Sequence, residues 1–215
     1  MNISLLSIGP PYRGGISEQT YYLYKNLSIN NEVELINFNR QYPKFLFPGK
    51  NQYDDESKFQ IKDNHRVVDS INPLSWSKTS RYITHKNPNL ILLRFWNPFF
   101  AISHGSIIKK IKKRHPEIKI IAICDNIIPH EKSMFDLKLI HYLFKNVDGF
   151  IVMSSKVEQE LLNIKSDSNY KKIFHPFSEK IQRFSKSEAR DKLKINRKNI
   201  ILFYGFIRDY KGLET

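Results

Sequence analysis

The sequence predicts an α/β fold in which helices pack on a parallel sheet. Short apolar segments with strand character alternate along the chain with amphipathic segments of helical spacing. Polar or glycine-bearing loops follow several of the apolar segments. Strands that are separated by helices pair in parallel through right-handed crossovers. We therefore expect one main parallel sheet with helices on both faces.

The expected elements follow in chain order, each bounded by turn-forming residues. We predict strands at 2–8, 32–38, 89–95, 118–124 and 149–153, a short extended segment at 171–177 and a buried final strand at 200–204. We predict helices at 16–28, 73–86, 99–115, 133–146, 155–164 (after a cap at Ser154) and 187–193. Residues 40–66 are polar and aromatic, and we expect them to form a mobile, irregular surface segment.

Composition limits the class of protein. The 215 residues, 40% of them hydrophobic, suffice for one large domain or two small ones with a real core. No apolar run reaches about 18 residues, so we expect no transmembrane helix. The N-terminal segment 1–12 is read as a first strand and not as a signal peptide. The single cysteine, Cys124, excludes an intrachain disulfide and fits a reducing compartment.

The net charge of +14 implies a polyanionic neighbour. Nucleic acid, an acidic membrane face and a phosphorylated substrate are all compatible with it. Basic residues crowd the end of the predicted helix 99–115, namely Lys109, Lys110, Lys112, Lys113 and Arg114. Cations at this end suit the helix dipole on a solvated surface. The alternative is a patch for anionic lipid.

Three polar loops follow predicted strands. They are GPPYRGG at 9–15, DNIIPHE at 125–131 and the pair Ser154-Ser155. Ligands of open parallel sheets bind outside the carboxyl ends of the strands, so we expect the three loops to share one cleft. Glycines in the first loop let a ligand approach the backbone. A tight strand-to-helix turn explains that loop equally well.

The last stretch, 199–215, combines an apolar segment with a cationic loop. Gly205 follows the apolar residues, and Arg208 and Lys211 precede a helix start at Gly212. Backbone N–H groups and two cations in this arrangement can surround a phosphate. Surface cations on a frayed tail are the alternative. Because a polar linker precedes this stretch, we expect a domain at 1–177 and the opening of a truncated second domain at 178–215.

Taken in order, these motifs resemble those of sugar-nucleotide glycosyltransferases with the two-domain GT-B fold, specifically the retaining family 4 (group 1) enzymes. The resemblance covers nearly the whole chain. Its motifs are Gly14-Gly15, DNIIPHE, the post-strand serine Ser154, the HPF segment at 175–177 and the tail GFIRDYKGL. It implies a Rossmann-like acceptor-side domain followed by the beginning of a donor-binding domain. The chain by itself would then be inactive.

The resemblance also implies roles for individual residues. Arg208 and Lys211 match the positions that hold the donor's diphosphate, together with Gly14 and Gly15. Asp125 stands where many relatives have a histidine close to the transferred sugar. Either Asp125 serves there or His130 reaches the site instead, and both are candidate catalytic residues. The candidate acceptor- or sugar-binding residues are Arg13, Asn126, Glu131 and Ser154.

The chemistry implied is stabilisation of a leaving diphosphate by positive charge. We expect no metal and no cofactor, since the sequence shows no closely spaced set of His, Cys and Asp. An aspartate that follows a strand, like Asp125, is also a common turn or helix cap. The aromatic residues Trp76, Trp96 and Phe99 can stack on a sugar, although such residues more often pack the core.

The predicted function is sugar transfer from a nucleotide-sugar donor to a glycan or lipid-linked acceptor. The resemblance places it in bacterial cell-envelope polysaccharide synthesis, in the cytoplasm or peripherally at the inner face of the membrane. Two alternatives remain. One is a non-catalytic binding or scaffold domain of the same fold. The other is a basic nucleic-acid-binding module. We expect no nucleic acid, since the basic residues are spread over several elements and no RNA-type aromatic motif is present.

Overall fold

The computed structural model describes residues 1–43, 51–54, 58–129, 134–176, 183–203 and 212–213. The chain divides into two compact units, Met1–Ser178 and Glu179–Thr215. The first unit holds a seven-stranded sheet. In the second unit, the described residues form one helix, α6 (Lys186–Leu193), which begins with a capping box between Ser185 and Glu188.

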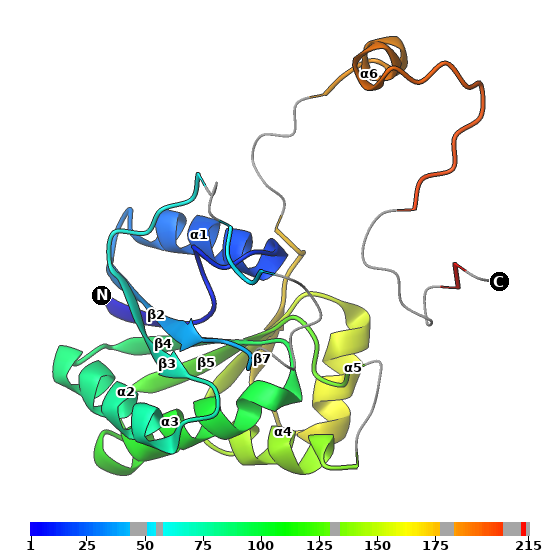
Figure 1. Cartoon of the computed structure of the whole chain (residues 1–215). Coiled ribbons are helices and arrows are strands. Elements are labelled where there is room, and N and C mark those ends of the chain that lie inside the picture. Colours follow the sequence, from blue (N-terminus) through cyan, green and yellow to red (C-terminus); the bar gives the residue numbers. More distant parts are fainter. Residues whose placement is uncertain (44–50, 55–57, 130–133, 177–182, 204–211, 214–215) are drawn as a thin grey trace. The chain divides into compact units, whose positions relative to one another are not determined.

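All strands of the sheet pair in parallel, in the order β3-β2-β1-β4-β5-β6-β7 (Figure 1). They are β1 (Asn2–Leu6), β2 (Glu32–Arg40), β3 (Asn64–Asp69), β4 (Leu90–Phe95), β5 (Lys119–Cys124), β6 (Gly149–Val152) and β7 (Tyr170–Lys172). The order reverses at the β1–β4 pair, where the chain turns from one side of β1 to the other. The predicted Rossmann-like α/β fold is confirmed.

Helices lie on both faces of this sheet (Figure 1). On one face α1 (Gly15–Leu27) packs against a small core that includes Leu5, Leu35 and Leu92. On the other face four helices share a larger core with η2 (Pro98–Phe100). They are α2 (Pro73–Lys86), α3 (Ala101–Arg114), α4 (Asp136–Phe144) and α5 (Ser155–Ile164). The carboxyl edge near α1 is therefore bordered by elements from both faces.

Helix α2 shows how local sequence sets an element's limits. Asn72 accepts a hydrogen bond from the Leu74 N–H through its side chain, and Pro73 occupies the first helical position. Asn87 ends the helix in the left-handed region at φ 48°. The bounds predicted for this helix, 73–86, are confirmed.

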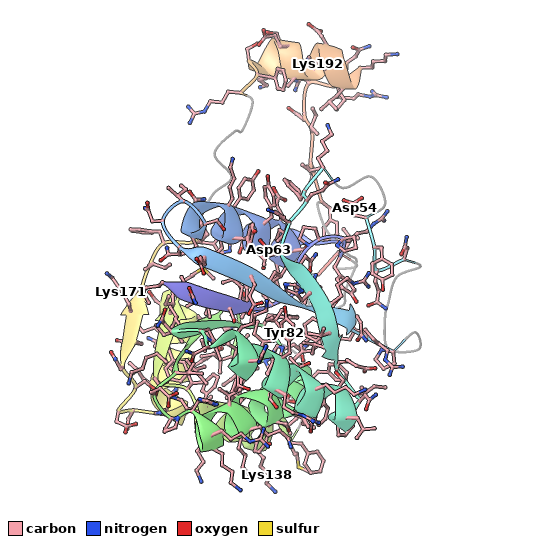
Figure 2. All side chains as sticks on the ribbon, turned by 90° about the vertical axis from the view of Figure 1, so that its left-hand side faces the viewer. Asp54, Asp63, Tyr82, Lys138, Lys171 and Lys192 are labelled. Atoms are coloured by element: carbon pink, nitrogen blue, oxygen red, sulfur yellow. The ribbon has the colours of Figure 1, made fainter. Side chains whose placement is uncertain are left out.

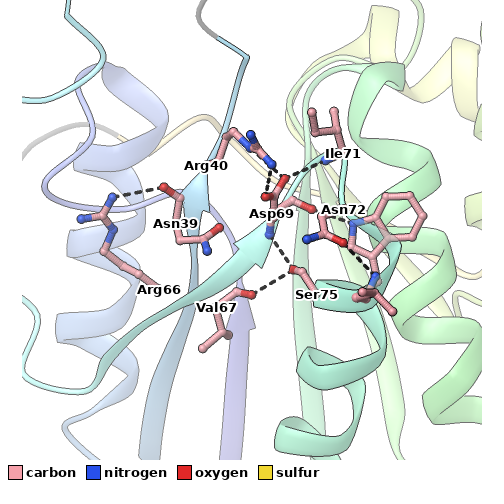
Figure 3. Close-up of polar contacts among 10 residues, drawn as sticks. Asn39, Arg40, Arg66, Val67, Asp69, Ile71, Asn72 and Ser75 are labelled. Carbon is pink, nitrogen blue, oxygen red and sulfur yellow. Dashed lines mark hydrogen bonds and ion pairs between the residues drawn. The ribbon is translucent and has the colours of Figure 1, made fainter.

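Polar contacts join β2, β3 and the start of α2 at the carboxyl edge of the sheet (Figure 3). The carboxylate of Asp69 accepts hydrogen bonds from Arg40 and from the Ile71 N–H. The Ser75 hydroxyl donates to the Val67 carbonyl and accepts from the Asp69 N–H at 2.8 Å. These bonds fix where β3 ends and α2 begins.

Two predictions are wrong. The segment 40–66 is not wholly irregular, because β3 begins at Asn64 and pairs with β2. The residues of β3 lack the alternation of apolar and polar side chains that is typical of a strand. Of these residues, only Val68 and Asp69 are buried. The buried strand expected at 200–204 is also absent from the described residues Ile200–Phe203, which are exposed. Strands need a hydrogen-bonded partner, and the described residues 183–203 contain no second strand for pairing.

Candidate functional site

A hollow of about 410 Å³ opens at the carboxyl edge of the sheet, close to the reversal of strand order. The residues that line it come from loops and helix starts after five different strands. They are Gly15, Ile16, Gln19, Trp96, Asp125, Asn126, Met153, Ser154 and His175. The three loops predicted to share one cleft meet here. This is the place where ligands of doubly wound sheets bind.

The start of α1 forms one wall of the hollow. Gly14 caps the helix at φ 114° and ψ 163°, a conformation that only glycine adopts readily. The first helical hydrogen bond runs from the Glu18 N–H to the Gly14 carbonyl, so the N–H groups of Gly15 and Ile16 have no partner within the helix. A Cβ atom on Gly14 or Gly15 would meet nothing within 4 Å. The positive end of α1 is therefore open to a ligand.

A second helix begins at the same hollow. Ser154 caps α5, and its hydroxyl accepts a hydrogen bond from the Val157 N–H at 3.2 Å. This leaves the N–H groups of Ser155 and Lys156 without partners inside the helix. Two helix dipoles thus add positive potential on the side of the hollow where α1 and α5 start.

The glycine loop is braced by residues 51–54. The contacts are an antiparallel bridge between Tyr12 and Tyr53, a hydrogen bond from the Arg13 N–H to the Gln52 carbonyl (2.9 Å) and one from the Asp54 N–H to the Pro11 carbonyl (2.8 Å). The guanidinium of Arg66 lies over both tyrosine rings, 5.4 and 5.1 Å from their centroids. Burial raises the pKa of Tyr12 to about 12. In its described part, the segment predicted to be mobile thus supports the glycine loop.

The floor of the hollow carries a chain of hydrogen bonds that starts inside β4. Arg94, whose side chain is 5% exposed, donates to both carboxylate oxygens of Asp125, at 2.7 Å from Nε and 2.6 Å from Nη2. Its Nη2 also donates to the Oε1 of Gln19. The Nε2 of Gln19 lies 3.1 Å from the Nε2 of His175, and the His175 Nδ1 lies 3.2 Å from the Pro176 carbonyl oxygen. The guanidinium of Arg94 therefore joins β4 to the loop after β5 and to α1, and Gln19 extends the chain of hydrogen bonds to the segment after β7.

The structure gathers part of the predicted site. The predicted site residues that line the hollow are Gly15, Asp125, Asn126 and Ser154. Gly14 is the residue before Gly15 in the sequence. Arg13 is exposed and is not among the lining residues. Four predicted site residues lie outside the described residues, namely His130, Glu131, Arg208 and Lys211. Their predicted roles therefore stay predictions.

The three aromatic candidates separate. Trp76 is buried in the core, where its indole N–H donates to the Asp69 carbonyl at 2.7 Å. Phe99 stacks on Tyr42 with 5.4 Å between ring centroids. Of these three residues, Trp96 is the one that lines the hollow. Its ring also contacts the ring of the buried Phe100, with 4.6 Å between ring centroids.

Gln19, Arg94 and Met153 were missed by sequence reasoning, and His175 was noted there only as part of the HPF segment at 175–177. The signal for Arg94 was present: a cation in the middle of the apolar strand LILLRF has to find a buried partner. Asp125, the first polar residue after the neighbouring strand, is that partner. Gln19 and Met153 carry no comparable signal.

Among the residues that the structure describes, no group of three or more His, Cys, Asp or Glu side chains is placed to hold a metal ion. In the same part of the chain, every helix is too short or too polar to cross a membrane.

No protein-family model and no curated protein matches the chain. Among solved structures, UDP-N-acetylglucosamine 2-epimerase from Rickettsia bellii is similar at a TM-score of 0.51 and 9% identity, over 80% of this chain and 43% of that one. An α-glucosyltransferase in complex with UDP and mismatched DNA is similar at a TM-score of 0.45 and 9% identity, over 79% of this chain and 40% of that one. A sucrose-phosphate synthase from Thermosynechococcus elongatus is similar at a TM-score of 0.48 and 12% identity, over 82% of this chain and 90% of that one.

The chain spans about two fifths of the length of the epimerase and of the glucosyltransferase. At 9% identity, the likeness to the epimerase supports the Rossmann-like fold and nothing further.

Proposed function

We propose that the chain is part of a glycosyltransferase that moves a sugar from a nucleotide-sugar donor to a glycan or lipid-linked acceptor. One observation carries the proposal: two helix N-termini, of α1 and α5, open into one hollow at the carboxyl edge of a parallel sheet. Unpaired N–H groups and helix dipoles at such an edge favour a phosphate-bearing ligand. The motif order of the sequence narrows that ligand to a nucleotide sugar.

In this proposal the donor's diphosphate lies against Gly14 and Gly15, where no side chain keeps it from the backbone. Arg208 and Lys211 supply the positive charge that stabilises the leaving diphosphate, without a metal ion. The reaction retains the configuration at the anomeric carbon, as the sequence resemblance implies. UDP is the first nucleotide to test, because the epimerase of similar fold is named for a UDP-sugar.

The sugar lies on the other side of the hollow. Trp96 offers an aromatic face for a sugar ring. Asn126 and Ser154 offer an amide and a hydroxyl group for its hydroxyls, and we propose that Arg13, Glu131 and His130 also contribute to binding. Asp125 keeps two oxygen acceptors at the hollow while Arg94 balances its charge.

The acceptor end of the reaction is proposed to lie at an anionic membrane, in cell-envelope synthesis at the inner face. We define the α3–α4 surface by its exposed lysines and apolar residues: Lys109, Lys110, Lys113, Lys138, Met134, Phe135 and Leu137. Figure 2 shows Lys138 directed away from the sheet. Lysines beside apolar side chains suit the headgroup region of an anionic bilayer. Lys112, by contrast, is held by Asp148 at 2.7 Å.

The test uses the full gene product with UDP-glucose, UDP-N-acetylglucosamine and GDP-mannose, each with polyprenyl-linked and free glycan acceptors. The expected result is release of the nucleoside diphosphate only when an acceptor is present. Gly15→Val should suppress the release, because its side chain would enter the space in front of α1. Ile29→Val, at an exposed site beyond α1, serves as the control. No release from any donor would refute the proposal.

A further inference from the structure

The hydrogen-bond chain in the floor of the hollow has only one consistent direction. The guanidinium of Arg94 can only donate, so the oxygen of Gln19 faces it and accepts. The amide nitrogen of Gln19 must then donate to the Nε2 of His175, because an amide nitrogen does not accept. Nε2 of His175 is therefore an acceptor and carries no proton.

The other ring nitrogen agrees with this direction. The carbonyl oxygen of Pro176 can only accept, so the Nδ1 of His175, 3.2 Å away, is the donor. These two contacts fit the tautomer of His175 that carries its proton on Nδ1. Turning the amide of Gln19 over would bring its N–H groups against Arg94, which has no acceptor. Arg94 therefore acts on the tautomer of His175 through Gln19, without contacting the His175 ring.

We propose that Arg94 is the positioning residue of this hollow. By binding Asp125 and Gln19 together it fixes the amide of Gln19, and through that amide it holds His175 in the Nδ1–H form. It also ties the end of β5, the first turns of α1 and the segment after β7 to one another. Asp125 then acts first as the counter-ion that keeps Arg94 in place. The bearing of this arrangement on sugar transfer rests on the proposed function, whereas the hydrogen-bond chain does not.

Two ion pairs and one uncharged contact are described around His175. Within α1 the contact is the uncharged Gln19. Across the hollow Arg94 and Asp125 neutralise each other. On β7, Lys172 is paired with Glu158 of α5 at 2.7 Å. The tautomer of His175 is therefore set by the direction of hydrogen bonds and not by a neighbouring net charge.

The experiment is two-dimensional NMR of the chain labelled with ¹⁵N-histidine at pH 8, where an ordinary histidine, with a pKa of about 6.5, is neutral. The wild type is expected to show the Nδ1–H pattern for His175. The double variant Arg94→Met/Asp125→Asn removes both charges together and frees Gln19. Its His175 signals should move to the mixture of tautomers seen in a free imidazole. The control is Arg40→Met/Asp69→Asn, a second ion pair at the same edge with no link to Gln19.

The Nε2–H pattern in the wild type would overturn the proposal, and so would an unchanged His175 in the folded double variant. If the double variant does not fold, Gln19→Leu provides the same readout with the Arg94–Asp125 pair intact. His175 should then also become mixed, and an unchanged ring refutes the proposal. No ligand is needed, so a confirmed tautomer switch combined with absent transferase activity would refute the proposed function alone.

Discussion

Asp125 and Arg94 form a bidentate ion pair at the carboxyl edge of the sheet, with side chains 13% and 5% exposed. The pair joins the carboxyl end of β4, where Arg94 lies, to the loop that follows β5. The sequence resemblance predicts that Asp125 stands where many of the enzymes it resembles have a histidine close to the transferred sugar. In this chain that position is held by a carboxylate whose two oxygens both bind a buried cation.

Because of this pairing, single substitutions should be far more damaging than a double one. Asp125→Asn leaves the buried guanidinium of Arg94 without its counter-ion and should lower the free energy of unfolding by about 3–5 kcal/mol. Arg94→Met should cost a similar amount. The double variant Arg94→Met/Asp125→Asn should recover most of the loss. Urea unfolding of the four proteins measures this coupling. Strictly additive losses would show that the pair is not a unit.

The two glycines before α1 should respond differently to alanine. Gly14 adopts φ 114° and ψ 163°, so Gly14→Ala should destabilise the fold by about 1–3 kcal/mol. Gly15 is the first helical residue and has no such backbone requirement, so Gly15→Ala should leave the unfolding free energy nearly unchanged. Thermal unfolding of both variants decides between them. Equal losses would contradict the backbone argument.

His104 should make the protein acid-sensitive. Its ring is fully buried beside Phe38, Trp96 and Phe100, and neither nitrogen has a partner among the described residues. Burial lowers its pKa from 6.5 to about 3. Between pH 6.5 and about pH 3, the unfolded chain therefore binds a proton at His104 that the folded chain does not bind. Through this residue alone, stability should fall by about 1.4 kcal/mol for each pH unit below 6.5.

The variant His104→Leu removes this contribution. Its free energy of unfolding, measured by urea titration from pH 7 to pH 4, should fall less steeply than that of the wild type by about that slope. Parallel curves for the two proteins would mean that His104 is not the residue responsible.

The α3–α4 surface should bind anionic vesicles through its exposed lysines. Each basic side chain near a lipid surface contributes about 1 kcal/mol, so Lys110→Gln/Lys113→Gln should weaken binding to phosphatidylglycerol vesicles about thirtyfold. The matched control is Lys25→Gln/Lys62→Gln, which removes the same charge outside this surface. Vesicle sedimentation at low salt measures both. Equal loss in the two variants would indicate a general charge effect and no dedicated surface.

The sequence could predict the elements whose signals are local. The helix at 73–86 carries its own caps, Asn72 and Asn87, and its limits were predicted correctly. The strand β3 has no such signal, because Asn64–Asp69 becomes a strand only by pairing with β2. The reverse holds for Ile200–Phe203, which have strand-like side chains but no partner strand among the described residues.

The candidate site follows the same division. Gly15, Asp125 and Ser154 were predicted because each follows a recognisable strand, and the parallel topology brings them together. Gln19 and His175 were not, since they are 156 positions apart and meet only through the geometry of the folded chain. Arg94 stands between the two cases: its burial was predictable, but its double contact with Asp125 and Gln19 was not.

An NMR titration of the ¹⁵N-labelled chain with UDP would show whether the hollow binds the diphosphate of a nucleotide sugar. We expect the backbone amide signals of Gly15 and Ile16 and the indole signal of Trp96 to shift with UDP at millimolar concentration, and uridine to leave the two amide signals unmoved. If UDP moves none of these signals, or if uridine moves them equally, the hollow does not bind a diphosphate and the proposed function is wrong.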